Sequence, residues 1–151
     1  AEELAKKYAL APYTMFIGSG ALWGETILFS MCILEEMQWK RTRYITSADF
    51  FHGTLELVEP GVPVFLFMGE DENRKLDERV RAFLTRGVTG DTDINIIDTA
   101  EFAIPGLDDE FRVIVSPWIL SSLITDRLAA YYETVTKHNL NYRRYYHQFD
   151  Y

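Results

Sequence analysis

Glu36 and His52 are the two residues whose types and spacing best suit proton transfer. His52 follows Glu36 by 16 positions, within a polar stretch that runs from Glu35 to Glu59. A carboxylate removes a proton from a carbon next to a carbonyl when burial brings its pKa toward neutrality. A histidine titrates near neutral pH and can deliver a proton elsewhere. The pair therefore suits acid–base chemistry, although a solvated carboxylate at a helix end and a capping or core histidine are the simpler alternatives.

Further polar candidates lie in segments that follow expected strands. A Gly-Ser-Gly turn precedes a long apolar segment, so its amides could hold an anion at a helix N-terminus, although a tight strand-to-helix turn is the simpler explanation. In the next segment, a serine could cap a helical turn, an aspartate could hydrogen-bond the backbone of that turn, and a glutamate could be an ion-pair partner or a second carboxylate in a cleft. The candidate substrate-binding residues here are Gly18, Ser19, Gly20, Ser47, Asp49 and Glu56.

The hydrophobic pattern predicts strands that alternate with helices. Helices are expected at 2–10, 22–39, 70–86 and 116–137, a helical turn at 48–52, and strands at 13–17, 43–46, 62–68, 93–97 and 111–115. The run VPVFLFM at 62–68 is typical of a strand buried on both faces. We therefore expect an α/β three-layer sandwich with a mainly parallel five-stranded sheet. Ligands of such sheets bind at the carboxyl ends of the strands, where the polar candidates lie.

Composition favours one domain and excludes several classes of partner. The chain has 151 residues, 48% of them hydrophobic, and a formal net charge of −8. This charge argues against non-specific binding to nucleic acid or to an anionic membrane, and no apolar run reaches the roughly 20 residues of a membrane span. The single cysteine, Cys32, has no metal-ligand spacing with His138 or His147, so neither a disulfide framework nor a metal is expected, and no cofactor either. A reducing, cytoplasmic compartment fits this cysteine usage.

The chain resembles the C-terminal sugar isomerase (SIS) domain of two-domain fructosamine 6-phosphate deglycases. Nearly the whole chain is covered, and the likeness is carried by SMCILEEMQW at 30–39, SADFFHGTLE at 47–56, VEPGVP at 58–63 and RRYYHQFDY at 143–151. The resemblance implies a single flavodoxin-like SIS domain over residues 1–151, with an N-terminal SIS domain before it and a homodimer partner. The start at Ala1, without methionine and inside an expected helix, fits a fragment of a longer chain.

The resemblance also implies roles for the polar residues. Glu36 would be the general base that moves a proton between sugar carbons of an open-chain ketoamine. His52 would help to open the ring or act as general acid in the active site of the neighbouring subunit, since the two residues are expected to lie too far apart within one subunit. Water would complete the release of an amino acid and leave glucose 6-phosphate. The matching tail adds Tyr151 as a candidate substrate contact.

Two departures from the wider SIS group limit the prediction. The Ser/Thr-rich phosphate loop is absent, and the matching position reads GEDEN at 69–73, so phosphate is expected to be held by the N-terminal half. The Schiff-base lysine near the C-terminus of glucosamine 6-phosphate synthases is also missing, since the last lysine is Lys137. The alternatives are a synthase-like isomerase domain and a non-catalytic sugar-phosphate-binding or dimerisation module.

Overall fold

The sheet has four strands, and all of them are parallel. The structure is a computed structural model that describes residues 1–150. Its strands are β1 (Tyr13–Gly18), β2 (Arg41–Ile45), β3 (Val64–Met68) and β4 (Ile94–Asp98), in the order β2-β1-β3-β4. Tyr13 of β1 lies opposite Arg41 of β2, and Val64 of β3 lies opposite Met15 on one side and Ile94 on the other. The predicted α/β fold class is confirmed, with four strands instead of five.

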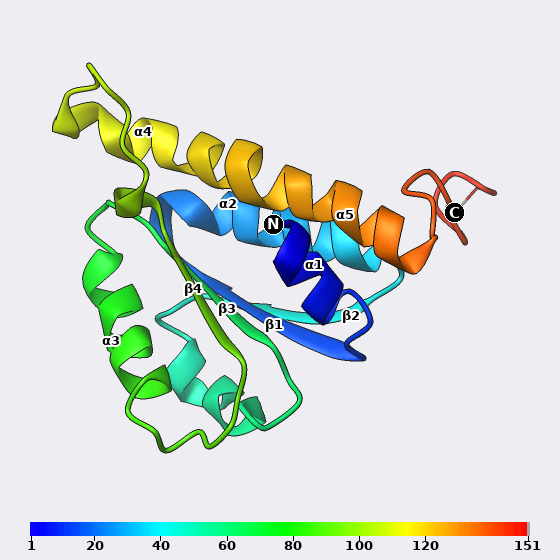
Figure 1. The fold of residues 1–151 in the computed structure, drawn as a ribbon, viewed down its shortest axis with the longest axis horizontal. Coiled ribbons are helices and arrows are strands. Elements are labelled where there is room, and N and C mark those ends of the chain that lie inside the picture. The colour runs from blue at the N-terminus through cyan, green and yellow to red at the C-terminus, as the bar shows by residue number, and fades with distance from the viewer. Residues whose placement is uncertain (151) are drawn as a thin grey trace.

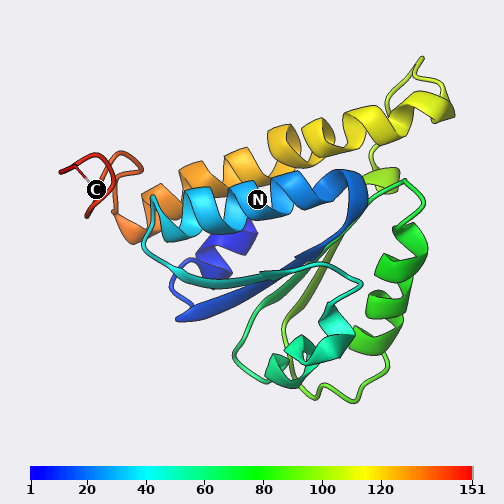
Figure 2. The ribbon, with the colours of Figure 1, turned by 180° about the vertical axis from the view of Figure 1, so that it is seen from behind.

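Helices cover both faces of this sheet (Figures 1 and 2). One face carries α1 (Glu2–Tyr8), α2 (Trp23–Ile27), α4 (Asp109–Leu120) and α5 (Asp126–Thr136), and the other carries α3 (Arg74–Leu84) and the 3₁₀ turns Phe50–His52 and Thr54–Leu57. The side chains of β3 alternate between the two cores, with Phe65 and Phe67 in the core under α5, and Leu66 in the core against α3. This burial on both sides explains why the strand is apolar throughout.

The predicted strand at 111–115 is wrong, because these residues belong to α4. The helix begins at Asp109 and continues into α5, so the last helix starts seven residues before the expected Ser116. The β-branched residues of FRVIV favoured a strand in the sequence. Pro117 does not break the helix, because Ser116 Oγ donates to Val113 O at 3.0 Å, the carbonyl for which proline has no N–H.

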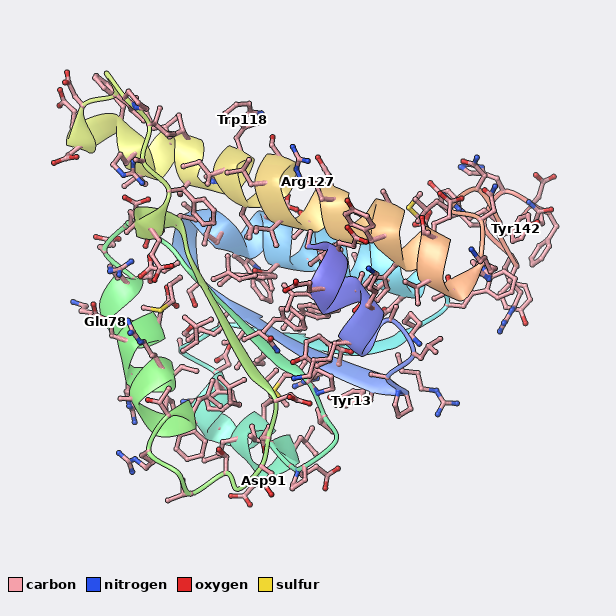
Figure 3. All side chains as sticks on the ribbon, in the orientation of Figure 1. Tyr13, Glu78, Asp91, Trp118, Arg127 and Tyr142 are labelled. Atoms are coloured by element: carbon pink, nitrogen blue, oxygen red, sulfur yellow. The ribbon has the colours of Figure 1, made fainter. Side chains whose placement is uncertain are left out.

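The continuous helical stretch Asp109–Thr136 is long and apolar enough, by length and composition, to cross a membrane, and an 18-residue window within it has a mean hydropathy of 1.3. The sequence pattern predicted a strand and a separate helix in this segment, and so it did not indicate a single helix of this length and hydrophobicity. In the structure its inner face packs into the domain core through Leu120, Leu128 and Tyr132. Trp118 projects from the outer face (Figure 3) and is 67% exposed. The stretch thus packs against the domain core along one face and leaves the other exposed.

Candidate active site

Glu36 lies at the end of the long helix that begins with α2. That helix widens into a π-helical segment, Leu28–Glu35, and Glu36 N donates to Met31 O at 3.0 Å, five residues back. Segments of this kind occur frequently at functional sites. Arg143 Nε lies 3.0 Å from Glu36 Oε1, and Oε2 accepts no hydrogen bond within residues 1–150. Glu36 is therefore held in place by one oxygen and keeps the other available to accept a proton.

A groove of about 460 Å³ opens beside Glu36. It is lined by Glu35, Glu36, Trp39, Lys40, Arg41, Arg144, Tyr145 and Tyr146. The carboxylate of Glu35 accepts a hydrogen bond from Thr42 Oγ1 at 2.6 Å, so it is tied to β2 instead of being merely solvated. The groove thus combines a proton acceptor, positive charges and aromatic rings, which suits a polar, anionic substrate.

The C-terminal tail forms one wall of this groove, and both ribbon views place the tail beside the end of the π-helical segment (Figures 1 and 2). Gln38 fastens the two together, because its Nε2 donates to His138 O at 2.7 Å and its Oε1 accepts from Thr136 Oγ1 at 2.8 Å. Trp39 has a left-handed backbone conformation with φ 53°. Its ring packs edge-on against that of His138, with 4.4 Å between the ring centroids. Arg144 stacks on Trp39 at 4.3 Å from the ring centroid.

The two serines among the candidates have partners within the protein. Both Ser19 and Ser47 are buried, and Ser47 N donates to Ser19 Oγ at 2.8 Å. Ser47 Oγ donates to Asp77 at 2.5 Å, and Gly69 N donates to the same carboxyl at 3.3 Å. Burial raises the pKa of Asp77 to about 6, against these two hydrogen bonds. The cluster links the loops after β1, β2 and β3, so it holds the carboxyl end of the sheet together.

An anionic side chain, that of Asp71, lies against the Gly18–Gly20 turn. Ala21 N donates to Asp71 Oδ2 at 2.6 Å, and Asn73 N donates to Oδ1 at 2.7 Å. Burial opposes ionisation of this carboxyl, but the backbone hydrogen bonds outweigh it and lower the pKa of Asp71. Gly20 has φ +55°, and a Cβ there would lie 2.2 Å from the carboxylate. A carboxylate of the protein thus lies where the turn was expected to hold an external anion.

His52 and Glu36 lie on opposite faces of the sheet. His52 is exposed and ends a 3₁₀ turn whose Phe50 packs in the core against α3, whereas Glu36 follows Leu34 of the core under α5. The chain by itself does not bring the predicted acid and base together. Asp49 Oδ2 accepts from Thr46 Oγ1 at 2.8 Å, which favours a role in the turn.

The contacts of the described residues assign no role to the last two candidates. Glu56 is exposed and has no ion-pair partner within residues 1–150. Tyr151 lies outside the described residues. Their roles therefore remain predictions, as do those of the other candidate residues.

Known proteins share both the sequence and the fold of this chain. It is 30% identical over 148 residues to the fructosamine deglycase FrlB of Bacillus subtilis, which covers 96% of this chain and 43% of the relative. It is 35% identical over 116 residues to the fructoselysine 6-phosphate deglycase of Escherichia coli, which covers 75% of this chain and 31% of the relative. A crystal structure of a Bacillus subtilis protein assigned as a phosphosugar isomerase superposes with a TM-score of 0.89 and 28% identity, over 99% of this chain and 44% of that one.

The chain is a SIS domain that is similar to part of the deglycases. It spans less than half the length of the curated relatives it matches. No family model matches the sequence. The identity of this SIS domain therefore rests on the relatives and on the solved structures.

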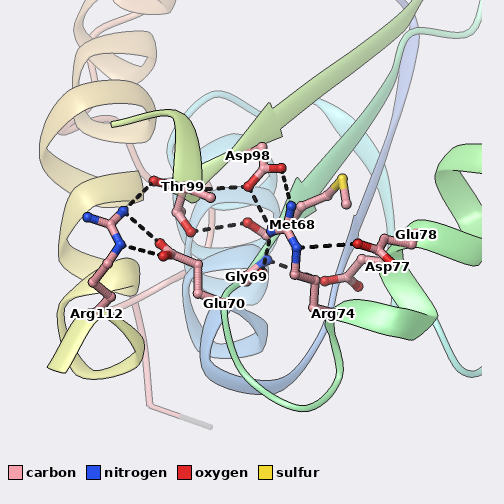
Figure 4. A network of polar contacts seen from close by, with 10 residues as sticks. Met68, Gly69, Glu70, Arg74, Asp77, Glu78, Asp98, Thr99 and Arg112 are labelled. Atoms are coloured by element: carbon pink, nitrogen blue, oxygen red, sulfur yellow. Dashed lines mark hydrogen bonds and ion pairs between the residues drawn. The ribbon is translucent and has the colours of Figure 1, made fainter. Parts of the chain in front are cut away.

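Sequence reasoning missed the ion pairs that organise the loops of the SIS domain (Figure 4). The Glu70 carboxylate accepts hydrogen bonds from Arg112 Nε at 2.5 Å and from Arg112 Nη2 at 3.0 Å. The Asp98 carboxylate forms a bidentate ion pair with Arg74, whose Nη1 and Nη2 donate at 2.8 Å and 2.6 Å. Both pairs are largely buried. The acidic residues after β3 are thus paired within the domain, which their spacing alone did not reveal.

Two of the groove's cations, Lys40 and Arg41, were also missed. Lys40 and Arg41 directly follow Trp39 in the sequence, so their closeness to Glu36 was available as a signal. The sequence suggests Arg144 as a ligand for a carboxylate or phosphate, or as part of a tail salt bridge. Its place on this groove could not be predicted, because it depends on the return of the tail to the helix end, where Gln38 and His138 meet across 100 residues.

Proposed function

We propose that this SIS domain supplies Glu36 as the general base of a fructosamine 6-phosphate deglycase. The observation that carries the proposal is the position of Glu36 on the groove, with Oε1 fixed by Arg143 and Oε2 free. The deglycase names of the relatives supply the substrate class, a 6-phosphorylated ketoamine formed from a sugar and an amino acid.

The chemistry asked of Glu36 is the transfer of one proton along the sugar. In the open-chain ketoamine, C1 lies between the amine nitrogen and the C2 carbonyl, so its protons are acidic enough for a positioned carboxylate. Glu36 removes a proton from C1, and a proton is returned to C2, which leaves an imine at C1. Water adds to the imine, the C–N bond breaks, and the products are glucose 6-phosphate and the free amino acid.

The remaining functions are proposed to come from outside this chain. His52 lies on the other face of the sheet, so we assign it to the active site of a second subunit. Neither serine nor threonine lines the described part of the groove, and Asp71 lies against the Gly18–Gly20 turn, so we assign phosphate binding to an N-terminal SIS domain. The working enzyme is then a cytoplasmic homodimer of two-domain chains, and 1–151 is the C-terminal half.

The proposal is tested by replacing Glu36 with glutamine in the complete protein. Amino-acid release from fructoselysine 6-phosphate and from other ketoamine 6-phosphates should fall by about a thousandfold, because glutamine cannot accept the proton. Glu35→Gln is the matched comparison: glutamine keeps the acceptor for Thr42, so the loss should be under about tenfold. Circular dichroism of both variants should match the wild type. Equal rates for Glu36→Gln and wild type would contradict the proposal.

Two alternatives predict different products. A synthase-like isomerase would convert a sugar phosphate without releasing an amino acid. A non-catalytic module would bind hexose phosphates tightly as residues 1–151 alone, whereas we expect weak or no binding, because the described part of the groove lacks hydroxyl groups of serine or threonine. Calorimetry with glucose 6-phosphate and product analysis by NMR separate the three functions.

A further inference from the structure

We propose that the groove beside Glu36 binds the carboxylate of the substrate's amino-acid portion through Lys40, Arg41 and Arg144. This inference rests on the proposed function, because it names what the same groove recognises beyond the sugar. The subsite would select ketoamines derived from amino acids over those derived from simple amines.

None of the three cations forms an ion pair in the described part of the chain. The two carboxylates on the groove are engaged by other residues: Glu36 by Arg143 and Glu35 by the hydroxyl of Thr42. The whole chain has 23 acidic residues against 15 basic ones, so a groove with more cations than carboxylates reverses the local charge. An anionic ligand would be drawn to this place and would supply the missing partner.

Lys40 carries its charge in a partly buried position without an ion-pair partner in the described chain. Its side chain is half-buried, and no carboxylate of residues 1–150 lies within ion-pair distance of its ammonium. Burial lowers the pKa of Lys40, since it disfavours the charged form. A ligand carboxylate beside the ammonium would reverse this effect, so binding of such a ligand is favoured.

Arg144 is positioned by Trp39 with its hydrogen-bonding edge free. The guanidinium carbon lies over the ring, 4.3 Å from its centroid, and no carboxylate or carbonyl in the described chain accepts a hydrogen bond from its N–H groups. A planar fork of this kind suits a carboxylate. Trp39 itself follows the helix end with φ 53°, a conformation that usually needs glycine. The strained tryptophan thus provides the surface that orients Arg144.

The groove fits a carboxylate better than a phosphate. It lies at the carboxyl end of the helix that includes Leu28–Glu35, where carbonyl groups and the negative end of the helix dipole disfavour a doubly charged anion. Glu35 and Glu36 add negative charge on the same groove. A singly charged carboxylate, offset by three cations, avoids most of this repulsion.

The test compares two substrates that differ only in the carboxylate. The complete protein is assayed with fructoselysine 6-phosphate, linked through the ε-amine, and with the same ketoamine made from cadaverine, which replaces the carboxylate by hydrogen. We expect the wild type to prefer the lysine compound by about tenfold or more in kcat/KM. Lys40→Met and Arg144→Gln should each raise KM for the lysine compound by about tenfold with little change in kcat, and should leave the cadaverine compound unaffected.

Lys75→Met is the control, because Lys75 is an exposed cation on α3 without an ion-pair partner in residues 1–150. It should change neither substrate's kinetics. A wild type that does not discriminate between the two compounds would overturn the proposal. Equal losses on both compounds in Lys40→Met and Arg144→Gln would also overturn it, because a general structural effect does not depend on the ligand's carboxylate.

A second readout separates this proposal from the proposed function. If the wild type releases amine from neither compound, the proposed function fails, and the subsite is then judged by binding. Free lysine should change the fluorescence of Trp39 in a saturable way, with no change in Trp39→Phe, and Lys40→Met should weaken binding by about tenfold. An identical response to lysine and to cadaverine would overturn the subsite.

Discussion

Replacing Asp77 with asparagine should stabilise the domain, and the gain should grow as the pH rises from 5 to 8. Asp77 is 1% exposed and accepts hydrogen bonds from Ser47 and Gly69. Asparagine has nearly the shape of the protonated acid, and it can accept from Gly69 N while its amide donates to Ser47 Oγ. The variant therefore keeps the contacts of the neutral acid and cannot carry a buried charge.

The size of the effect follows from the pKa. Burial raises the pKa of Asp77 from 3.8 to about 6; Asp71 adds to the rise, and the hydrogen bonds and Arg74 oppose it. The folded state thus binds this proton more tightly than the unfolded chain. Stability from the protonated acid is complete below the unfolded pKa and is lost as the pH rises through the folded pKa. At 1.36 kcal/mol per pKa unit the whole effect is about 3 kcal/mol, of which about 1.4 kcal/mol falls between pH 5 and pH 8.

The assay is urea unfolding of the wild type, Asp77→Asn and Asp91→Asn at several pH values between 5 and 8. Asp91 is an exposed carboxylate and serves as the control. The free energy of unfolding of Asp77→Asn, minus that of the wild type, should increase by about 1.4 kcal/mol across this range. A difference that stays flat would refute the reasoning. A variant less stable than the wild type at pH 8 would also refute it, because the hydrogen bonds would then favour the ionised form.

Two further perturbations test the loops around the carboxyl edge. Gly20→Ala should destabilise the domain by about 2 kcal/mol in urea unfolding, since φ is +55° and the new Cβ meets Asp71, whereas Gly24→Ala, where nothing lies within 4 Å, should be neutral or stabilising by up to about 1 kcal/mol. Equal effects at the two glycines would contradict the role of Asp71. Arg74→Met should cost about 2 kcal/mol at neutral pH after allowance for solvent screening. The cost of Arg74→Met should shrink in acid. Burial raises the pKa of Asp98, but Arg74 together with the other partners of this carboxylate lowers it below its usual value, so the ion pair's contribution to stability is lost as the pH falls through that pKa. A cost that does not depend on pH would contradict this role of Arg74.

The sequence was most informative where burial dictates residue type. β3 has side chains buried on both faces, and its apolar run predicted a strand buried in this way. The sequence was misleading at FRVIV (111–115), where β-branched residues favour a strand in isolation. There the helix is set by tertiary contacts: Arg112 pairs with Glu70 and donates to Thr99 O at 3.0 Å, and Ser116 compensates for Pro117. Local propensity does not include such contacts.

The site could be predicted only in part for a related reason. Glu36 was marked by its place at a helix end and by the resemblance to deglycases. The wall of the groove that Arg144 provides depends on the bonds between Gln38 and His138, 100 residues apart, and Asp71 reaches Ala21 across 50 residues. Contacts this distant leave no pattern in the local spacing of residues.

The most direct test of Glu36 as the base follows the proton itself. Fructoselysine 6-phosphate deuterated at C1 is incubated with the complete protein, and NMR measures the loss of deuterium from C1 together with the release of lysine. The wild type should lose one deuterium from C1 for each lysine released, and Glu36→Gln should slow both by about a thousandfold. Loss of the label and release of lysine at the wild-type rate in Glu36→Gln would contradict the account.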